Sequence, residues 1–183
     1  MKLELIPFAK YLTLGEDAMH ELKVIYCMAK WDGKVLGWDR IPLERLKYIE
    51  VFTIRNWFKK NDIKACINAV RLSYKLTEEQ VLMANSFEIV RAIEAIIKDL
   101  NTLLKREAEF LKYPEDSKYS QAAGDRLQKF ELYNVLDAVT NKDRTKWDWA
   151  KNMPYITIFT ILHKNCVEAH IEADYRRLIK LRK

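Results

Sequence analysis

The chain has 183 residues and a net charge of +6; 49% of its residues are hydrophobic and 32% are charged, as in helix-rich globular proteins. Four glycines and four prolines are too few for a β-sandwich, and no apolar run approaches the roughly 18 residues of a membrane span. We therefore expect an all-α chain without a membrane partner.

Residues 1–14 are expected to form an extended N-terminal arm. Pro7 opposes an early helix, and the apolar residues of this segment lack helical spacing. Such an arm docks either on its own core or on a neighbouring molecule. A first helix is predicted over 16–30, because its first turn is acidic and its apolar residues recur every three to four positions.

Residues 31–41 are predicted to form a loop or a small hairpin, because Asp32-Gly33 is a turn signal. Trp31 and Trp38 flank this turn. We favour burial of both indoles in the chain's own core. An exposed contact with a partner is the alternative, since tryptophan is common at interface hot spots.

Two further helices are predicted over 42–60 and 62–74. Pro42 suits the first turn of the former, and Asp62 is a good N-cap for the latter. The apolar residues of the second helix are spaced by three to four positions, which favours one buried face.

An unbroken central helix is predicted over 77–112, a stretch that contains neither proline nor glycine. Thr77 and Gln80 form a capping-box pattern at its start. Its apolar residues recur every seven positions in two adjacent columns, so we expect a broad buried face at the centre of a helical bundle. One column is Met83, Val90, Ile97, Leu104 and Leu111; the other is Leu82, Ile89, Ile96, Leu103 and Phe110.

Residues 113–124 are predicted to be a linker, because they contain Pro114, an acidic pair and mostly polar side chains. The chain is then divided into a helical bundle with its arm (1–112), this linker, and a C-terminal helical subdomain (125–183). The subdomain could pack on the bundle or swing away from it.

Three helical segments are expected in the subdomain: 125–139, a short one over 143–149, and a long closing helix over 154–182. The closing helix ends in a basic stretch. Residues 141–183 hold ten Lys or Arg and five Asp or Glu. The cations either contact DNA or an acidic protein, or simply complement the negative end of the helix. They are Arg176, Arg177, Lys180, Arg182 and Lys183.

One pattern of metal-ligating residues stands out on the closing helix. His163, Cys166, His170 and Asp174 lie on one side of it, and zinc accepts each of these groups. The four span about 16 Å, so one ion could take only an adjacent pair, and we favour core and surface roles. No phosphate-binding glycine loop, dinucleotide fingerprint or nucleophile elbow occurs in the sequence. We expect no metal, no cofactor and no catalytic residue.

Several features of the C-terminal part occur together: Phe130-Glu-Leu-Tyr133, Asp143 before Lys146-Trp147, Met153-Pro154-Tyr155, and the long closing helix. With them, residues 127–178 resemble the ends of small helical proteins from tailed-bacteriophage structural modules. The resemblance implies a non-enzymatic protein of the virion, present in the host cytoplasm during assembly. Its role would be that of a head–tail connector, ring, neck or tail component, or alternatively a tail-assembly chaperone absent from the mature virion.

The resemblance also implies partners. These are other copies of the chain in a ring-like assembly, portal or tail proteins, and DNA through the basic end. We expect Phe8 on the arm, together with Trp31 and Trp38, to contact a neighbouring subunit. A nucleic-acid-binding helical module is a further alternative, because Lys and Arg alternate with Trp147 and Trp149.

Overall fold

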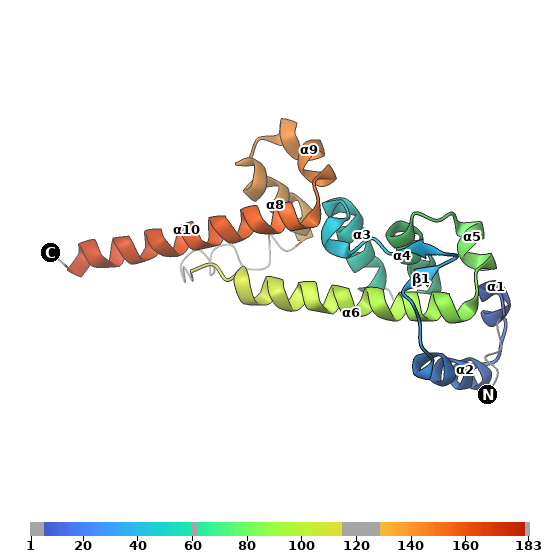
Figure 1. Ribbon diagram of the computed structural model, residues 1–183. Coiled ribbons are helices and arrows are strands. Elements are labelled where there is room, and N and C mark those ends of the chain that lie inside the picture. The colour runs from blue at the N-terminus through green and yellow to red at the C-terminus, as the bar shows by residue number, and fades with distance from the viewer. Residues whose placement is uncertain (1–5, 60–61, 115–128, 182–183) are drawn as a thin grey trace. The chain divides into compact units, whose positions relative to one another are not determined.

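The computed structural model describes residues 6–59, 62–114 and 129–181, with only the backbone described for 180 and 181. Most of these residues are helical, and the only strands among them form one two-stranded hairpin, which confirms the all-α class (Figure 1). They form two compact units. Unit 1 comprises residues 1–46 and 50–101, and unit 2 comprises 47–49 and 102–183.

The division between the units falls earlier than the sequence suggests. It lies between Asn101 and Thr102, inside a helix, and not at the predicted linker. Most of that linker, residues 115–124, and the start of the helix expected over 125–139 lie outside the described residues.

Unit 1 is built from short helices around the first part of a long one. In chain order the elements are α1 (Phe8–Tyr11), α2 (Glu16–Met28), β1 (Lys34–Val35), β2 (Trp38–Asp39), a 3-10 turn η1 (Leu43–Arg45), α3 (Tyr48–Lys59), α4 (Ile63–Tyr74), α5 (Glu78–Met83) and α6 (Ser86–Phe110). The first two residues of α3 and the last turns of α6 belong to unit 2.

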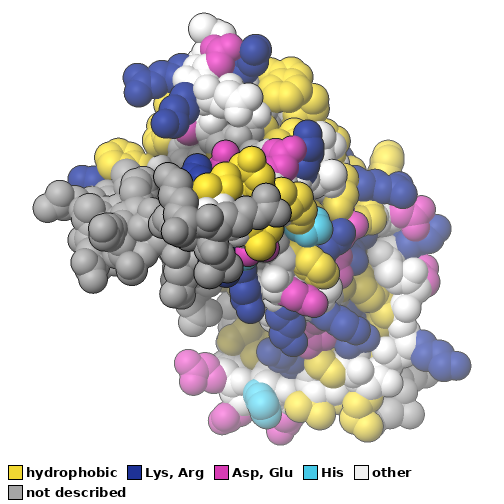
Figure 2. Space-filling model, turned by 90° about the vertical axis from the view of Figure 1, so that its left-hand side faces the viewer, with side chains coloured by type: hydrophobic (Ala, Val, Ile, Leu, Met, Phe, Trp, Pro, Cys, Tyr) yellow, Lys and Arg dark blue, Asp and Glu magenta, His cyan; other side chains and the backbone are white. Residues whose placement is uncertain are grey.

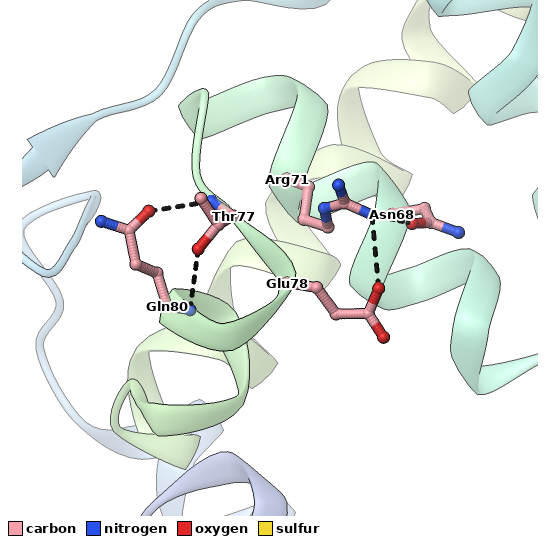
Figure 3. Close-up of polar contacts among 5 residues, drawn as sticks. All are labelled: Asn68, Arg71, Thr77, Glu78 and Gln80. Atoms are coloured by element: carbon pink, nitrogen blue, oxygen red, sulfur yellow. Dashed lines mark hydrogen bonds and ion pairs between the residues drawn. The ribbon is translucent and has the colours of Figure 1, made fainter.

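The predicted central helix is wrong as a single element, because α5 and α6 are separated at Ala84 and Asn85. Ala84 has an extended backbone, and the Asn85 side chain accepts a hydrogen bond from the Phe87 amide at 3.0 Å. Asparagine favours such a local bond over a continued helix. The capping box at the start of α5 is confirmed: Thr77 and Gln80 bond each other's backbone amides (Figure 3).

The N-terminal segment is docked on this break and is not extended throughout. The Phe8 amide donates to the Ala84 carbonyl and the Ser86 amide donates to the Ile6 carbonyl, both at 2.8 Å. After Pro7 the chain turns into α1, which corrects the expected extended arm. The fixed φ of proline suits the start of a helix, and its missing backbone N–H would have no partner inside the helix at that position. Pro7 therefore favours the start of α1 at Phe8.

The helix expected over 42–60 also begins later, at Tyr48. The Ile41 amide donates to the Ser73 carbonyl at 2.8 Å, and the next residues make the η1 turn. Leu43 and Leu46 are buried on either side of that turn. The gain from burying both side chains accounts for the interruption of a helix that local signals alone would favour. By contrast, α4 follows the prediction, with Asp62 accepting from the Lys64 amide at 3.1 Å.

Unit 2 contains α8 (Glu131–Thr140), a 3-10 turn η3 (Arg144–Lys146), α9 (Trp147–Asn152) and α10 (Tyr155–Leu181), together with the end of α6. The short segment and the closing helix therefore occur where they were predicted. Figure 1 shows α8 and α9 beside the first half of α10, whose second half continues past them. The core of the unit is made by Leu136, Ala150, Tyr155, Ile158 and Phe159.

The two apolar columns of α6 do not share the same burial. Ile89 and Ile96, from one column, are fully buried, whereas Ile97 from the other is 38% exposed. Burial does not follow the columns throughout, because Val90, in the column of Ile97, is buried and Phe110, in the column of Ile96, is 41% exposed; the neighbours Ile96 and Ile97 nevertheless lie in the core and at its rim.

This difference gives a matched test within one helix. We expect Ile96→Ala to lower the free energy of unfolding by about 2–5 kcal/mol, because it leaves a cavity in a close-packed core. Ile97→Ala removes the same atoms from the rim and should cost less than about 1 kcal/mol. Urea unfolding followed by circular dichroism measures both; equal losses would contradict the assigned faces of α6.

Candidate interaction surfaces

The β1–β2 hairpin presents one exposed tryptophan. Trp38 is 61% exposed, so its predicted burial is wrong, while Trp31 is half-buried and donates its Nε1–H to the Lys34 carbonyl at 2.8 Å. Leu36 and Gly37 have positive φ angles, which make the tight two-residue turn between β1 and β2, and both residues of β2 are exposed. Of the two indoles, Trp38 is the one available to a partner.

The hairpin is held firmly on unit 1. The Glu88 carboxylate of α6 accepts from the Leu36 amide at 3.0 Å, and the Tyr74 hydroxyl of α4 donates to the Gly33 carbonyl at 3.2 Å. Burial raises the pKa of Tyr74, so its hydroxyl remains a donor. These bonds anchor the backbone of the hairpin before and after β1, so the backbone that carries Trp38 loses little entropy on binding.

Phe8 is not part of an exposed surface. Its side chain is 1% exposed and stacks on Tyr11 with ring centroids 5.9 Å apart. It belongs to the core of unit 1. A buried Phe8 side chain cannot make the expected contact with a neighbouring subunit.

Three of the candidate metal-ligating residues of α10, His163, Cys166 and His170, make other contacts. His163 packs edge-on against Phe110, while Cys166 Sγ and His170 Nε2 lie 2.9 and 2.6 Å from the Lys112 carbonyl oxygen. Burial raises the pKa of the Cys166 thiol, which keeps it a hydrogen-bond donor. In the described part of the chain, no three His, Cys, Asp or Glu residues are grouped so that they could hold a metal ion.

A second apolar stripe lies on the outer side of α10, and the sequence analysis missed it. Its members recur at spacings of four, four, three and one residues, which is a helical pattern. The pattern was present in the sequence, but only the stripe that faces the core was assigned a role. Ile171, Tyr175 and Leu178 are 64%, 63% and 60% exposed. The complete stripe is Val167, Ile171, Tyr175, Leu178 and Ile179.

The basic end of α10 is exposed but already paired. Arg176 lies 3.2 Å from Glu172, and Arg177 lies 3.5 Å from Asp174, each across one helical turn. Such exposed pairs contribute little energy, so the cations remain able to meet an anionic partner. The side chain of Lys180 is not described, and Arg182 and Lys183 lie outside the described residues.

The tryptophans of unit 2 have different roles. Trp147 packs on Tyr133 with ring centroids 5.2 Å apart, and its Nε1–H donates to Asp137 at 3.1 Å. Trp149 is 49% exposed and lines a pocket of about 550 Å³ beside α8, together with Lys146. Only Trp149 is therefore free to stack on a base or a partner side chain.

Two of the cations near these tryptophans have acidic partners in the chain, while Arg144 lies over the Trp147 ring, 5.6 Å from its centroid. Lys146 lies 3.0 Å from Asp143, and Lys151 lies 3.0 Å from Asp148. On the face drawn in Figure 2, acidic side chains are likewise interspersed among the basic ones. The phosphates of a nucleic acid bind most strongly to cations that have no acidic neighbour. This arrangement is therefore only weakly suited to nucleic-acid binding.

A second pocket, of about 520 Å³, lies in unit 1 between α3 and α4. Arg71 borders it and lies 2.9 Å from the Asn68 side chain and 3.5 Å from Glu78 (Figure 3). Lys75, also at its edge, lies 2.9 Å from Glu50. The lining is otherwise mainly apolar, and its two cations are each opposed by a carboxylate. We see no pairing of a nucleophile with a base among the residues that border it.

Comparison with family models, with curated proteins and with solved structures finds no match to this chain. No helix in the described ranges is both long enough and apolar enough to cross a membrane.

The turn before α9 offers a test of its local electrostatics. The Thr145 hydroxyl donates to the Asp143 carboxylate at 2.6 Å, and this bond, followed by that with Lys146, lowers the pKa of Asp143. A lowered pKa stabilises the fold above the unfolded pKa, and the contribution is lost as pH falls through the folded value.

We expect Thr145→Ala to raise the pKa of Asp143 toward its ordinary value, because the hydroxyl donor is lost. Carbon-detected NMR titration of the Asp143 carboxyl measures this change. Thr160→Ala, which removes a hydroxyl bonded to the Ile156 carbonyl in α10, is the matched control and should leave the titration unchanged. An unshifted Asp143 in Thr145→Ala would refute the assigned bond.

Proposed function

We propose that this chain is a non-enzymatic structural protein of a tailed-bacteriophage virion, acting as a head–tail connector, ring, neck or tail component through protein–protein contacts. The observation that carries the proposal is the exposure of Trp38 in unit 1 and, separately, of the outer α10 stripe in unit 2. Large apolar side chains exposed together are typical of surfaces that bind other proteins. The resemblance of residues 127–178 supplies the phage context.

The pockets lend support of a different kind. The cations that border them are opposed by carboxylates of the same chain, as at Arg71 with Glu78 and Lys146 with Asp143. A substrate pocket instead brings together several polar groups with unused hydrogen-bonding capacity, whereas among the described residues that border these two pockets the only buried side-chain nitrogen or oxygen without a hydrogen-bond partner is the Nε of Arg71. This favours a binding role over turnover of a small molecule.

Within an assembly we assign the two surfaces separate tasks. The Trp38 hairpin of unit 1 contacts a different surface of the next copy, which is the kind of repeated contact that closes a ring. Arg176 and Arg177 of unit 2 face DNA or an acidic surface of a portal or tail protein, after exchanging their weak pairs within the helix.

Mass spectrometry of purified virions tests the central claim. We expect the chain at a fixed stoichiometry relative to the portal and tail proteins. Its presence in infected cells together with its absence from washed particles would favour a tail-assembly chaperone and contradict a virion component.

A substitution tests the role of the hairpin. We expect Trp38→Ser to abolish species larger than a dimer when the chain is co-expressed with its phage neighbours, because the central apolar anchor of the contact is lost. Gel filtration with light scattering gives the mass. Met28→Ser removes an exposed apolar side chain of α2 in the same unit and is the control; equal loss in both variants would argue against a specific Trp38 contact.

A further inference from the structure

We propose that the pocket between α3 and α4 binds a carboxylate attached to a large apolar group, as presented by an acidic and aromatic segment of a partner protein. The inference deepens the proposed function, on which it rests only for the identity of that partner. The site belongs to unit 1 alone. Its lining comes from α3, from α4 and from the two positions after α4, and consists of Trp57, Asn68, Arg71, Leu72, Lys75 and Leu76.

The polar side chains that line the pocket are mainly hydrogen-bond donors. The side chains of arginine, lysine and tryptophan have no acceptor atom. The remaining polar residue, Asn68, has a side-chain oxygen, but this atom already accepts from Arg71 at 2.9 Å (Figure 3). None of the described residues that line the pocket is acidic. A ligand that offers acceptor atoms and negative charge is therefore complementary to it.

The guanidinium of Arg71 is not fully bonded within the chain. Its Nε is buried and has no hydrogen-bond partner among the described residues. A buried donor without an acceptor is unfavourable, so the guanidinium loses little when it turns to bond a ligand in the pocket. Arg71 lies in the last turn of α4, where a cation also offsets the negative end of the helix. That role needs the charge but does not account for an unbonded Nε.

The carboxylates that oppose the two cations can be exchanged for that of a ligand. Arg71 lies 3.5 Å from Glu78, which is longer than a well-formed hydrogen bond, and both side chains are at least 39% exposed. Glu78 is in the first turn of α5, where the positive end of that helix also stabilises it. Lys75 lies closer to Glu50, at 2.9 Å, but its side chain is 52% exposed, and such pairs contribute little energy.

The same four charges favour a ligand with a single negative charge. Arg71 and Lys75 are balanced by Glu78 and Glu50, so the site has no excess of positive charge for a dianion such as phosphate. A carboxylate has one negative charge, and its two oxygens match the planar fork of an arginine side chain.

The rest of the lining favours an apolar group next to that carboxylate. Leu72 and Leu76 directly follow Arg71 and Lys75 in the sequence, and Trp57 adds an indole from α3. Leu76 is buried, while Trp57 and Leu72 are half-buried. Because the cations and the leucines occupy adjacent positions, the carboxylate and the apolar group of the ligand must also be adjacent. A glutamate beside a phenylalanine has this arrangement, and a pocket of about 520 Å³ has room for the pair.

The exposure of the cations favours a protein segment over a small molecule. Sites for small molecules bury most of the surface of their ligand. Here the side chains of Arg71 and Lys75 are 39% and 52% exposed, so a ligand bonded to them stays open to solvent on one side. A residue within a longer chain needs such an opening, because the chain continues on both sides of it.

An NMR titration of the full chain with two short peptides tests the site. The probes are acetyl-Ala-Glu-Phe-Ala-amide and the neutral acetyl-Ala-Gln-Phe-Ala-amide. We expect the acidic peptide to shift the Nε–H signal of Arg71 with a dissociation constant of about 1 mM, as for other small ligands in open pockets. The neutral peptide should bind at least about tenfold more weakly, because it cannot form a charge-assisted bond.

Substitutions assign the binding to the pocket. Arg71→Lys keeps the charge but loses the planar fork, and should weaken binding of the acidic peptide about tenfold. Lys75→Gln removes one charge at an exposed position and should weaken it about threefold. Lys64→Gln removes the same charge from an exposed position at the start of α4 and should bind like the wild type. Backbone amide shifts of α4 give the binding curves of the variants, and circular dichroism checks that each is folded.

Several outcomes would overturn the inference. They are an Arg71 signal that does not move up to about 10 mM acidic peptide, equal binding of the two peptides, or binding that is unchanged in both Arg71→Lys and Lys75→Gln. Tighter binding of inorganic phosphate would contradict the single charge. Binding of the free acid N-acetylphenylalanine without binding of the acidic peptide would contradict a protein partner.

The virion test is separate from this one. A protein that is absent from virions but binds the acidic peptide through Arg71 would refute the proposed function and leave the site standing. A virion protein whose pocket binds neither peptide would do the reverse.

Discussion

The docking of the N-terminal segment on the break between α5 and α6 is the constraint on which unit 1 depends. Ala84 and Ser86 are fully buried, so their backbone groups need partners, and the segment from Ile6 to Phe8 supplies them. The Tyr26 hydroxyl then shares a 2.8 Å hydrogen bond with the Ser86 side chain, which ties α2 to the same point. The start of α6, and with it the Glu88 anchor of the hairpin, is fixed by these bonds.

Unit 2 depends on the end of α6 in a comparable way. The Lys112 carbonyl, just after that helix, lies against Cys166 and His170, and the Tyr155 hydroxyl donates to Glu107 at 2.7 Å. These contacts all lie on one side of α10. They determine which stripe is covered by the chain itself, and so which stripe is left for another molecule.

The features that depend on local chemistry, such as helix caps, were predicted correctly from the sequence. The caps at Asp62 and Thr77 need only a side-chain oxygen close to a free amide, and both occur as expected. The break at Ala84 could not be predicted, because no proline or glycine marks it. Its hydrogen-bond partners, Ile6 and Phe8, lie far from it in the sequence. Ile96 and Ile97 show the same limit: their periodicity is alike, and only the tertiary packing separates them.

The candidate surfaces were harder to predict than the helices, since exposure is a property of the whole fold. Trp38 and Trp31 are equally apolar and flank the same turn, yet Trp31 is half-buried and bonded to the Lys34 carbonyl, whereas Trp38 is 61% exposed. The outer stripe of α10 was visible as a spacing, but a stripe becomes informative only when the opposite side is known to be filled.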